Sequence, residues 1–206
     1  MGFVYATATL EPTKQELAEA WLPSQPWAAG ATSVTKLAEY RFDDPDGEVG
    51  IETIVWRTPD GTLLQVPFTY RATPLDGAEA HLVGTSQHSA LGPRYVYDGC
   101  YDPVWVATVV SAILTGGTQA QMQVEHDGQL VDVPARLPVC GSGAPGAEVP
   151  DISSVDAVSD DGGVTTVVAG PVTVSLARVV GTPLPGSATL TGSAGDRELG
   201  TLVTVG

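Results

Sequence analysis

Hydrophobic and polar residues alternate along much of this chain, a pattern that predicts β-strands. The clearest pair covers residues 49–57 and 62–70. These segments flank the turn Thr58-Pro59-Asp60-Gly61 and so predict a β-hairpin. Similar patterns predict strands over residues 4–10, 35–42, 81–84, 94–97, 119–125, 129–133, 164–169, 172–180, 187–192 and 199–205.

A first helix is predicted over residues 14–22. Thr13 is a suitable N-cap, and Glu16 follows at the spacing of a capping box, in which each side chain satisfies a free amide of the first turn. Pro23 and Pro26 end the helix, because proline restricts the residue before it and cannot continue the hydrogen-bond pattern.

A second helix is predicted over residues 103–115 and is almost entirely apolar. Asp102 and Pro103 form an N-cap and first-turn pair, and Gly116 and Gly117 supply the stop. A helix with almost no polar face must be covered on most sides, so we expect a curved sheet to wrap around it. The many β-branched residues leave a strand as the alternative for this segment.

These elements predict an α+β fold, in which a curved antiparallel sheet wraps a helix and a small β extension follows. Residues 1–137 hold the sheet and both helices. Residues 138–163 are rich in glycine, proline and acidic residues, which predicts a linker or a long loop. Residues 164–206 form the β-rich extension.

The chain carries 9 basic and 24 acidic residues, a formal net charge of −15. This composition provides no basic patch able to neutralise several phosphates, so it argues against nucleic acid and anionic membranes as partners. Cys100 and Cys140 are the only cysteines and form no CxxC pair, which favours a reduced, cytoplasmic protein. The N-terminus does not resemble a secretion signal, and the apolar segment 104–114 is shorter than the roughly 20 residues that cross a bilayer.

Gly141, Gly143 and Gly146 match the GxGxxG pattern of dinucleotide-binding loops. That site needs a strand before the loop and a helix after it, and Pro145 and Pro150 prevent the helix. We interpret the glycines as part of a flexible linker and expect no cofactor.

A kinase active site is also excluded by the sequence. Phosphoryl transfer needs a lysine on the phosphates and acidic residues for magnesium. Lys14 and Lys36 are the only lysines, both lie before any glycine-rich loop, and no HRD-like or DFG-like triplet is present.

Two sets of residues are possible metal ligands, and neither has a metal-binding spacing. The acidic segment 43–48 lacks the order of an EF-hand and is interrupted by Pro45. The histidines match no zinc pattern: His81, His88 and His126. We therefore predict an acidic surface turn and no metal.

Two serines and one cysteine are candidate nucleophiles. A Ser-His-Asp set could form from Ser86 or Ser89 with His88 and Asp98. Neither serine lies in a nucleophile elbow, so we favour structural hydrogen bonding for these residues over catalysis. Cys100 precedes a helix N-terminus, where a thiolate would be stabilised, but neighbouring aspartates offset that gain and favour a packing role.

The aromatic residues allow a sugar site as a further possibility. Trp21, Trp27 and Trp56, with Tyr95 and Tyr97, would stack on sugar rings if they were exposed. Their positions in predicted strands and helices favour a core role instead.

Residues 10–27, LEPTKQELAEAWLPSQPW, resemble the opening of actinobacterial maltokinases, which has the form PTK-x-EL…WLP-x-Q-W. The resemblance continues through the strand pair of residues 50–71. It extends through residues 94–113, where VYDG and DPV lead into the apolar helix, and in total covers residues 5–135. Residues 172–180, VTVSLARVV, resemble the passage from this region into the kinase N-lobe.

This resemblance implies an N-terminal cap domain, a cystatin-like curved antiparallel sheet that holds a helix. In maltokinases the cap sits on an aminoglycoside-phosphotransferase-like body and carries no catalytic groups. The sequence ends at Gly206 without the nucleotide lysine or the catalytic aspartate of that body, so we expect a stand-alone cap-like protein that is not an enzyme. It also offers no carboxylate set for glycosyl transfer.

Three functions follow as hypotheses. The first is a non-catalytic regulatory or interaction protein linked to maltose, trehalose and glycogen (α-glucan) metabolism, which binds a sugar kinase, another α-glucan enzyme or a second copy of itself. The alternative is a sugar- or metabolite-binding module whose pocket holds His88, Arg94, Tyr95 and Asp98. The third is a small enzyme that uses His88 or Cys100.

Overall fold

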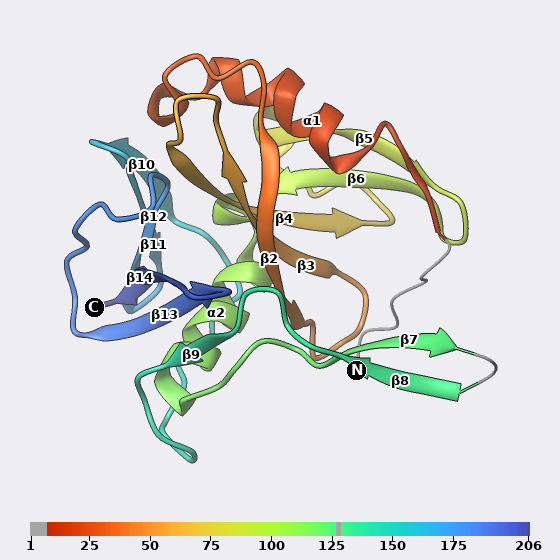
Figure 1. Cartoon of the computed structure of the whole chain (residues 1–206). Helices are drawn as coiled ribbons and strands as arrows, with labels where there is room; N and C mark the ends of the chain where they lie inside the picture. The colour runs from red at the N-terminus through yellow and green to blue at the C-terminus, as the bar shows by residue number, and fades with distance from the viewer. Residues whose placement is uncertain (1–7, 127–128) are drawn as a thin grey trace.

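The computed structural model describes residues 8–126 and 129–206, whose strands form two six-stranded antiparallel sheets and a separate hairpin (Figure 1). The strands of the first sheet, in spatial order, are β1 (Leu10–Glu11), β5 (Leu82–His88), β6 (Gly92–Asp98), β4 (Leu63–Arg71), β3 (Gly50–Arg57) and β2 (Thr35–Asp43). This sheet holds the predicted hairpin between β6 and the edge strand β2.

The second sheet comes from the C-terminal third of the chain. Its strands, in spatial order, are β10 (Ala157–Asp161), β11 (Val164–Ala169), β12 (Val172–Ala177), β14 (Arg197–Val205), β13 (Ala188–Ala194) and β9 (Val139–Gly141). The two sheets join where Leu64 of β4 bridges Val179: the Gln65 amide donates to the Arg178 carbonyl at 2.8 Å, and the Val180 amide donates to the Leu63 carbonyl at 2.9 Å.

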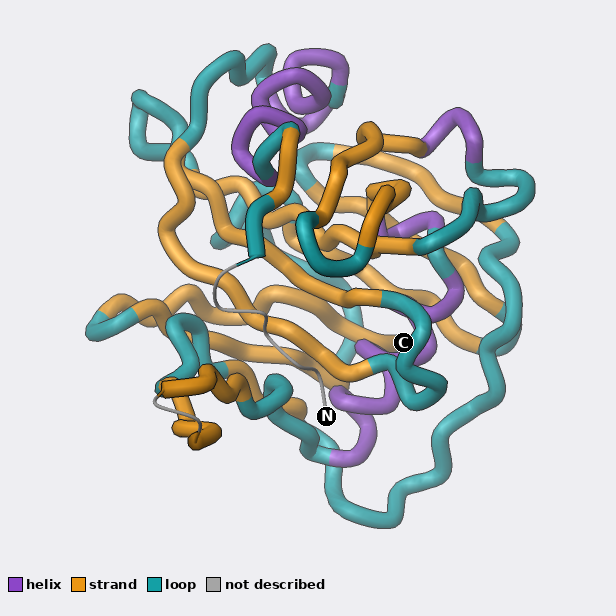
Figure 2. The backbone as a smooth tube through the Cα atoms, turned by 90° about the vertical axis from the view of Figure 1, so that its right-hand side faces the viewer, coloured by secondary structure: helices purple, strands orange, loops and turns teal. Residues whose placement is uncertain are grey.

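One face of the first sheet is covered by α1 (Lys14–Trp21) and the short 3-10 turns η1 (Leu22–Ser24) and η2 (Pro26–Ala28). Thr13 and Glu16 form the predicted capping box, so the start of α1 is fixed by its own sequence. The side view shows α1 at the top of the molecule, with strands between it and the helical segment below (Figure 2). The core on this face contains Leu17, Leu22, Trp27, Ile54, Trp56, Leu64, Val66, Phe68 and Val96.

The opposite face of the first sheet packs on α2 (Pro103–Thr115), which lies between the two sheets. Asp102 is the N-cap and accepts from the Val104 amide at 3.0 Å, while Gly116 ends the helix at a φ of 70°. The shared core joins Tyr40, Phe42, Ile51 and Val55 of the first sheet to Trp105, Val106, Val109 and Ile113 of α2 and to Val174, Leu176, Leu190 and Leu202 of the second sheet.

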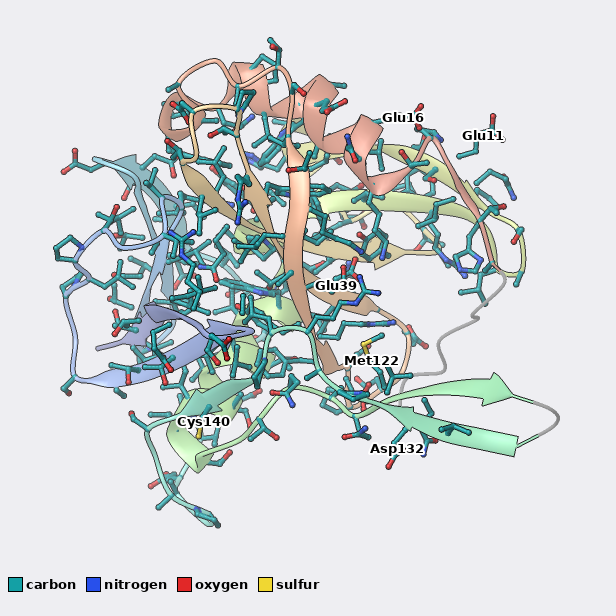
Figure 3. All side chains as sticks on the ribbon, in the orientation of Figure 1. Glu11, Glu16, Glu39, Met122, Asp132 and Cys140 are labelled. Atoms are coloured by element: carbon teal, nitrogen blue, oxygen red, sulfur yellow. The ribbon has the colours of Figure 1, made fainter. Side chains whose placement is uncertain are left out.

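The chain also forms two further 3-10 turns, η3 (Glu79–His81) and η4 (Gly99–Tyr101). The hairpin of β7 (Met122–His126) and β8 (Gln129–Val133) extends away from both sheets, and Figure 3 shows Met122 and Asp132 on it. Within the described residues, no helix is long and apolar enough to cross a membrane.

The predicted α+β fold is confirmed, and so is the helix over residues 103–115 in place of a strand. The curved sheet covers one side of that helix and the second sheet covers another. The predicted strand over residues 4–10 lies mostly outside the described residues, and Leu10 and Glu11 form β1. The boundaries at residues 137 and 163 stay a prediction, although β9 and β10 form regular strands in the segment expected to be a linker.

Candidate functional site

The structure divides the four predicted site residues between three environments. His88 and Arg94 line one cleft of about 510 Å³. Tyr95 follows Arg94 in β6, so strand alternation turns it toward the opposite face. Asp98 ends β6 in a buried position and pairs with Arg178. Their common role in binding a ligand stays a prediction, but the geometry brings only His88 and Arg94 together.

An ion pair between a buried carboxylate and a partly exposed lysine lines this cleft. Glu52 of β3 is only 4% exposed, and its carboxylate lies 2.6 Å from the Lys14 ammonium at the start of α1. The Tyr70 hydroxyl lies 3.0 Å from the same carboxylate, and Lys14 also stands 5.6 Å from the centre of the Tyr70 ring. Arg41 is the cross-strand neighbour of Glu52 and lines the cleft as well.

These neighbours keep Glu52 ionised in spite of its burial. Burial raises the pKa of Glu52, but the charge and hydrogen bond of Lys14, the charge of Arg41 and the Tyr70 hydroxyl together lower it below the ordinary value. Burial and the nearby Glu52 carboxylate raise the pKa of Tyr70, so its hydroxyl stays protonated and donates to Glu52. The site is therefore a fixed set of charged donors and acceptors.

His88 stands at the rim of the cleft, and its imidazole caps the β5–β6 turn. Its Nδ1 accepts from the amides of Ala90 and Leu91 at 3.1 and 3.2 Å. Partial burial, followed by the charges of Arg94 and Lys14, lowers the pKa of His88 and keeps the ring neutral at neutral pH.

The residues of the Ser-His-Asp set are held by other partners. Ser86 donates to the Pro12 carbonyl at 2.7 Å, and the Ser89 hydroxyl accepts from the Thr9 amide at 3.0 Å. Asp98 lies 2.5 Å from Arg178. The structure therefore assembles no such triad from these residues.

Cys100 is a buried residue of η4, which fits the predicted packing role. Burial raises the pKa of its thiol well above the ordinary value, so the thiol is protonated at neutral pH and is a poor nucleophile. The other histidine near this region, His81, stacks on Tyr101 with ring centres 3.3 Å apart.

The GxGxxG sequence meets the C-terminal end of α2, which is the wrong end of a helix for a phosphate. The Gly143 amide donates to the Ile113 carbonyl at 2.9 Å, and the Ala144 amide donates to the Leu114 carbonyl at 3.1 Å. The glycine loop thus satisfies the free carbonyls of the helix end.

The acidic segment 43–48 is a self-capped turn. Asp44 accepts from the amides of Asp46, Glu48 and Val49 at 2.8 to 3.1 Å. Among the residues described, no group of three or more metal-ligating side chains gathers to hold an ion. Asp44 therefore fixes the turn between β2 and β3.

The sequence patterns did not predict that Glu52, Lys14 and Tyr70 lie together in one site. The available signal was Glu52, a charged residue on the same face of β3 as Ile54 and Trp56. A carboxylate on an apolar strand face needs a cation, and the start of α1 supplies it.

Residues 21–102 match the family model of the maltokinase N-terminal cap domain. The matched segment runs from the end of α1 through β2, β3, β4, β5 and β6 to the N-cap of α2. The resemblance to maltokinase caps is confirmed over these residues, a narrower span than the 5–135 expected from the sequence. The match is to a cap and not to a kinase catalytic domain. No curated protein matches the chain.

Proposed function

We propose that this chain is a non-catalytic, cytoplasmic regulatory or interaction protein of maltose, trehalose and glycogen metabolism, which acts by surface contact with an α-glucan enzyme. The match of residues 21–102 to a maltokinase cap carries the proposal. The absence from the sequence of the kinase lysine and of HRD-like and DFG-like triplets supports a role without phosphoryl transfer.

The exposed strand edges supply surfaces for such contact. In the described part of the chain, β1 pairs with β5 only at Leu10–His88 and Glu11–Gln87, and β7 and β8 pair only with each other. An isolated two-stranded hairpin has little stability of its own, and an open edge offers amides and carbonyls to a partner strand. These features favour strand addition as the mode of binding.

The test is sedimentation velocity of the purified chain with purified intact maltokinase, beside a concentration series of the chain alone. The proposal predicts a saturable complex with the kinase, distinct from any self-association seen in the concentration series, and a changed maltokinase rate if the contact is regulatory. A chain that leaves both the sedimentation and the rate of the kinase unchanged would overturn it.

The cleft supports a sugar- or metabolite-binding module as a second candidate. The ionised Glu52, its donors Lys14 and Tyr70, and the guanidinium of Arg94 surround a volume in the range of small-molecule sites. Charged side chains of both signs suit the many hydroxyls of a sugar or a sugar phosphate.

This candidate is tested by calorimetric titration with maltose, maltose 1-phosphate and trehalose. If one of them binds in the cleft, Arg94→Ala raises its Kd about tenfold or more. Arg57→Ala is the matched control, because Arg57 is exposed and lies outside the cleft. Absence of heat with all three sugars, or equal effects of the two variants, would contradict the candidate.

A further inference from the structure

A second hollow runs along the outer face of α2, on the side that neither sheet covers. This α2 groove has a volume of about 690 Å³. The groove is lined by α2, by the segment 149–153 and by the turn 43–46. The helix side chains in the groove are Pro103, Val104, Ala107, Thr108, Ser111 and Ala112.

Along the groove, α2 is not covered by other parts of the protein, although a helix with almost no polar face is expected to be covered on most sides. Val104 and Ala107 are only half-buried, whereas Trp105, Val106, Val109 and Val110 are fully buried on the other side of α2. Apolar Phe42 and Ile152 continue the floor beneath them. The groove therefore presents an apolar surface to whatever enters it.

The rim of the groove is acidic. Its lining includes Asp43, Asp44, Asp46 and Asp151, and none of the described residues in it is a lysine, arginine or histidine. Arg71, near this end of α2, is held by the helix N-cap, Asp102, through two hydrogen bonds of 2.7 Å. An apolar floor beneath a negative rim selects an occupant with apolar anchors and flanking positive charge.

A second copy of this chain does not supply that charge. The whole chain has 9 basic residues against 24 acidic ones. Four of the basic residues are already paired with carboxylates: Lys14, Lys36, Arg71 and Arg178. Bringing two chains of formal charge −15 together through an acidic rim would be opposed by their charges.

We propose that the α2 groove binds a cationic amphipathic segment of a protein partner, with apolar side chains on Val104 and Ala107 and lysines or arginines against the aspartate rim. Small residues one turn apart, Ala107 and Ser111, let the backbone of the bound segment approach α2 closely. The inference rests on the proposed function, that the chain works by binding another protein, and names the chemistry of that partner.

The probes are two fluorescent peptides with leucines at positions i, i+3, i+4 and i+7 and either lysines or glutamates elsewhere. Anisotropy with the full chain is expected to show binding of the lysine peptide, weaker at physiological than at low salt. Ala107→Trp, which fills the groove, and Asp46→Asn/Asp151→Asn are each expected to raise the Kd about tenfold.

The control is Asp161→Asn/Asp196→Asn, which removes the same charge from exposed positions outside the groove. It should leave the Kd within about twofold, because distant exposed charges are screened. Equal losses in the two double variants, equal binding of the glutamate peptide, or no binding of the lysine peptide would each overturn the inference. Tighter binding of spermidine than of the lysine peptide at the groove would also overturn it, in favour of a small amine.

The same variants separate this inference from the proposed function. If the chain binds maltokinase and Ala107→Trp leaves that affinity unchanged, the groove proposal fails and the proposed function stands. If the lysine peptide binds through the groove while no maltokinase complex forms, the groove proposal stands and the proposed function fails.

Discussion

Arg178 and Asp98, 80 residues apart in the sequence, form a buried ion pair with 2.5 Å between Nη2 and Oδ2. The Arg178 guanidinium also donates to the Thr165 hydroxyl at 2.7 Å and lies 4.6 Å from the centre of the Trp27 ring. Asp98 in turn accepts from the Cys100 amide at 3.2 Å. One side chain thus ties the second sheet to β6 and to the turn after α1.

Removing the charge of Arg178 should therefore destabilise the whole fold. Arg178→Met leaves the Asp98 carboxylate buried without its cation, and the free energy of unfolding should fall by about 3–5 kcal/mol in urea titrations. The control Lys36→Met breaks the more exposed pair with Glu39 and should cost no more than about 1 kcal/mol.

A double variant checks the physical reason. Arg178→Met/Asp98→Asn removes both charges and keeps an acceptor for the Cys100 amide, so it should be more stable than Arg178→Met alone. If the double variant instead loses the sum of the two single losses, the two charges are not coupled and this account of the pair is wrong.

The Glu52–Lys14 pair predicts a difference in acid stability. Because the pKa of Glu52 is lowered in the folded chain, the unfolded chain binds more protons, and this contribution to stability is present above the ordinary pKa of 4.5. It is lost as the pH falls below 4.5 and through the folded pKa. The unfolding free energy of the wild type should thus drop more steeply in acid than that of Glu52→Gln.

The measurement is urea unfolding of both chains from pH 7 down to the acid transition. The difference between them should stay constant above about pH 5 and shrink below it. Parallel curves over the whole range would show that Glu52 has the same pKa in the folded and unfolded chains.

The glycine loop at the end of α2 should not tolerate a side chain. A Cβ on Gly143 would lie 1.8 Å from the Leu114 carbonyl oxygen, and the loop would have to leave the helix end. We expect Gly143→Ala to lower the free energy of unfolding by about 3 kcal/mol or more.

Gly195→Ala provides the comparison for this variant. Gly195 has a φ of 59°, and nothing lies near its Cβ position, so only the backbone conformation opposes alanine there, at about 1–2 kcal/mol. Equal losses in the two variants would mean that the contact with α2 contributes nothing. Thermal unfolding followed by circular dichroism compares them directly.

The sequence predicted the elements that depend on neighbouring residues. The hairpin of β3 and β4 follows from alternation around a Pro-Asp-Gly turn, and α2 follows from its Asp102 cap and its glycine stop. The turn sequence and the helix caps lie within or directly beside the elements that they predict, so no knowledge of the remaining fold was needed.

The sequence patterns did not predict which distant segments pair with each other. Asp98 was expected beside His88 in a pocket, but its partner Arg178 comes from the end of β12. β9 and β10 were missed because short strands in a Gly- and Pro-rich segment form only against β13 and β11. Tyr95 was grouped with Arg94 although adjacent strand residues face opposite sides.

Hydrogen exchange of the chain with and without saturating intact maltokinase would show both whether the two proteins bind and which residues of the chain they cover. If the chain works by contact with this enzyme, amide exchange should slow only in an exposed region, such as β5, the β7–β8 hairpin or α2 beside its groove. Unchanged exchange along the entire chain would contradict a role that depends on contact with this enzyme.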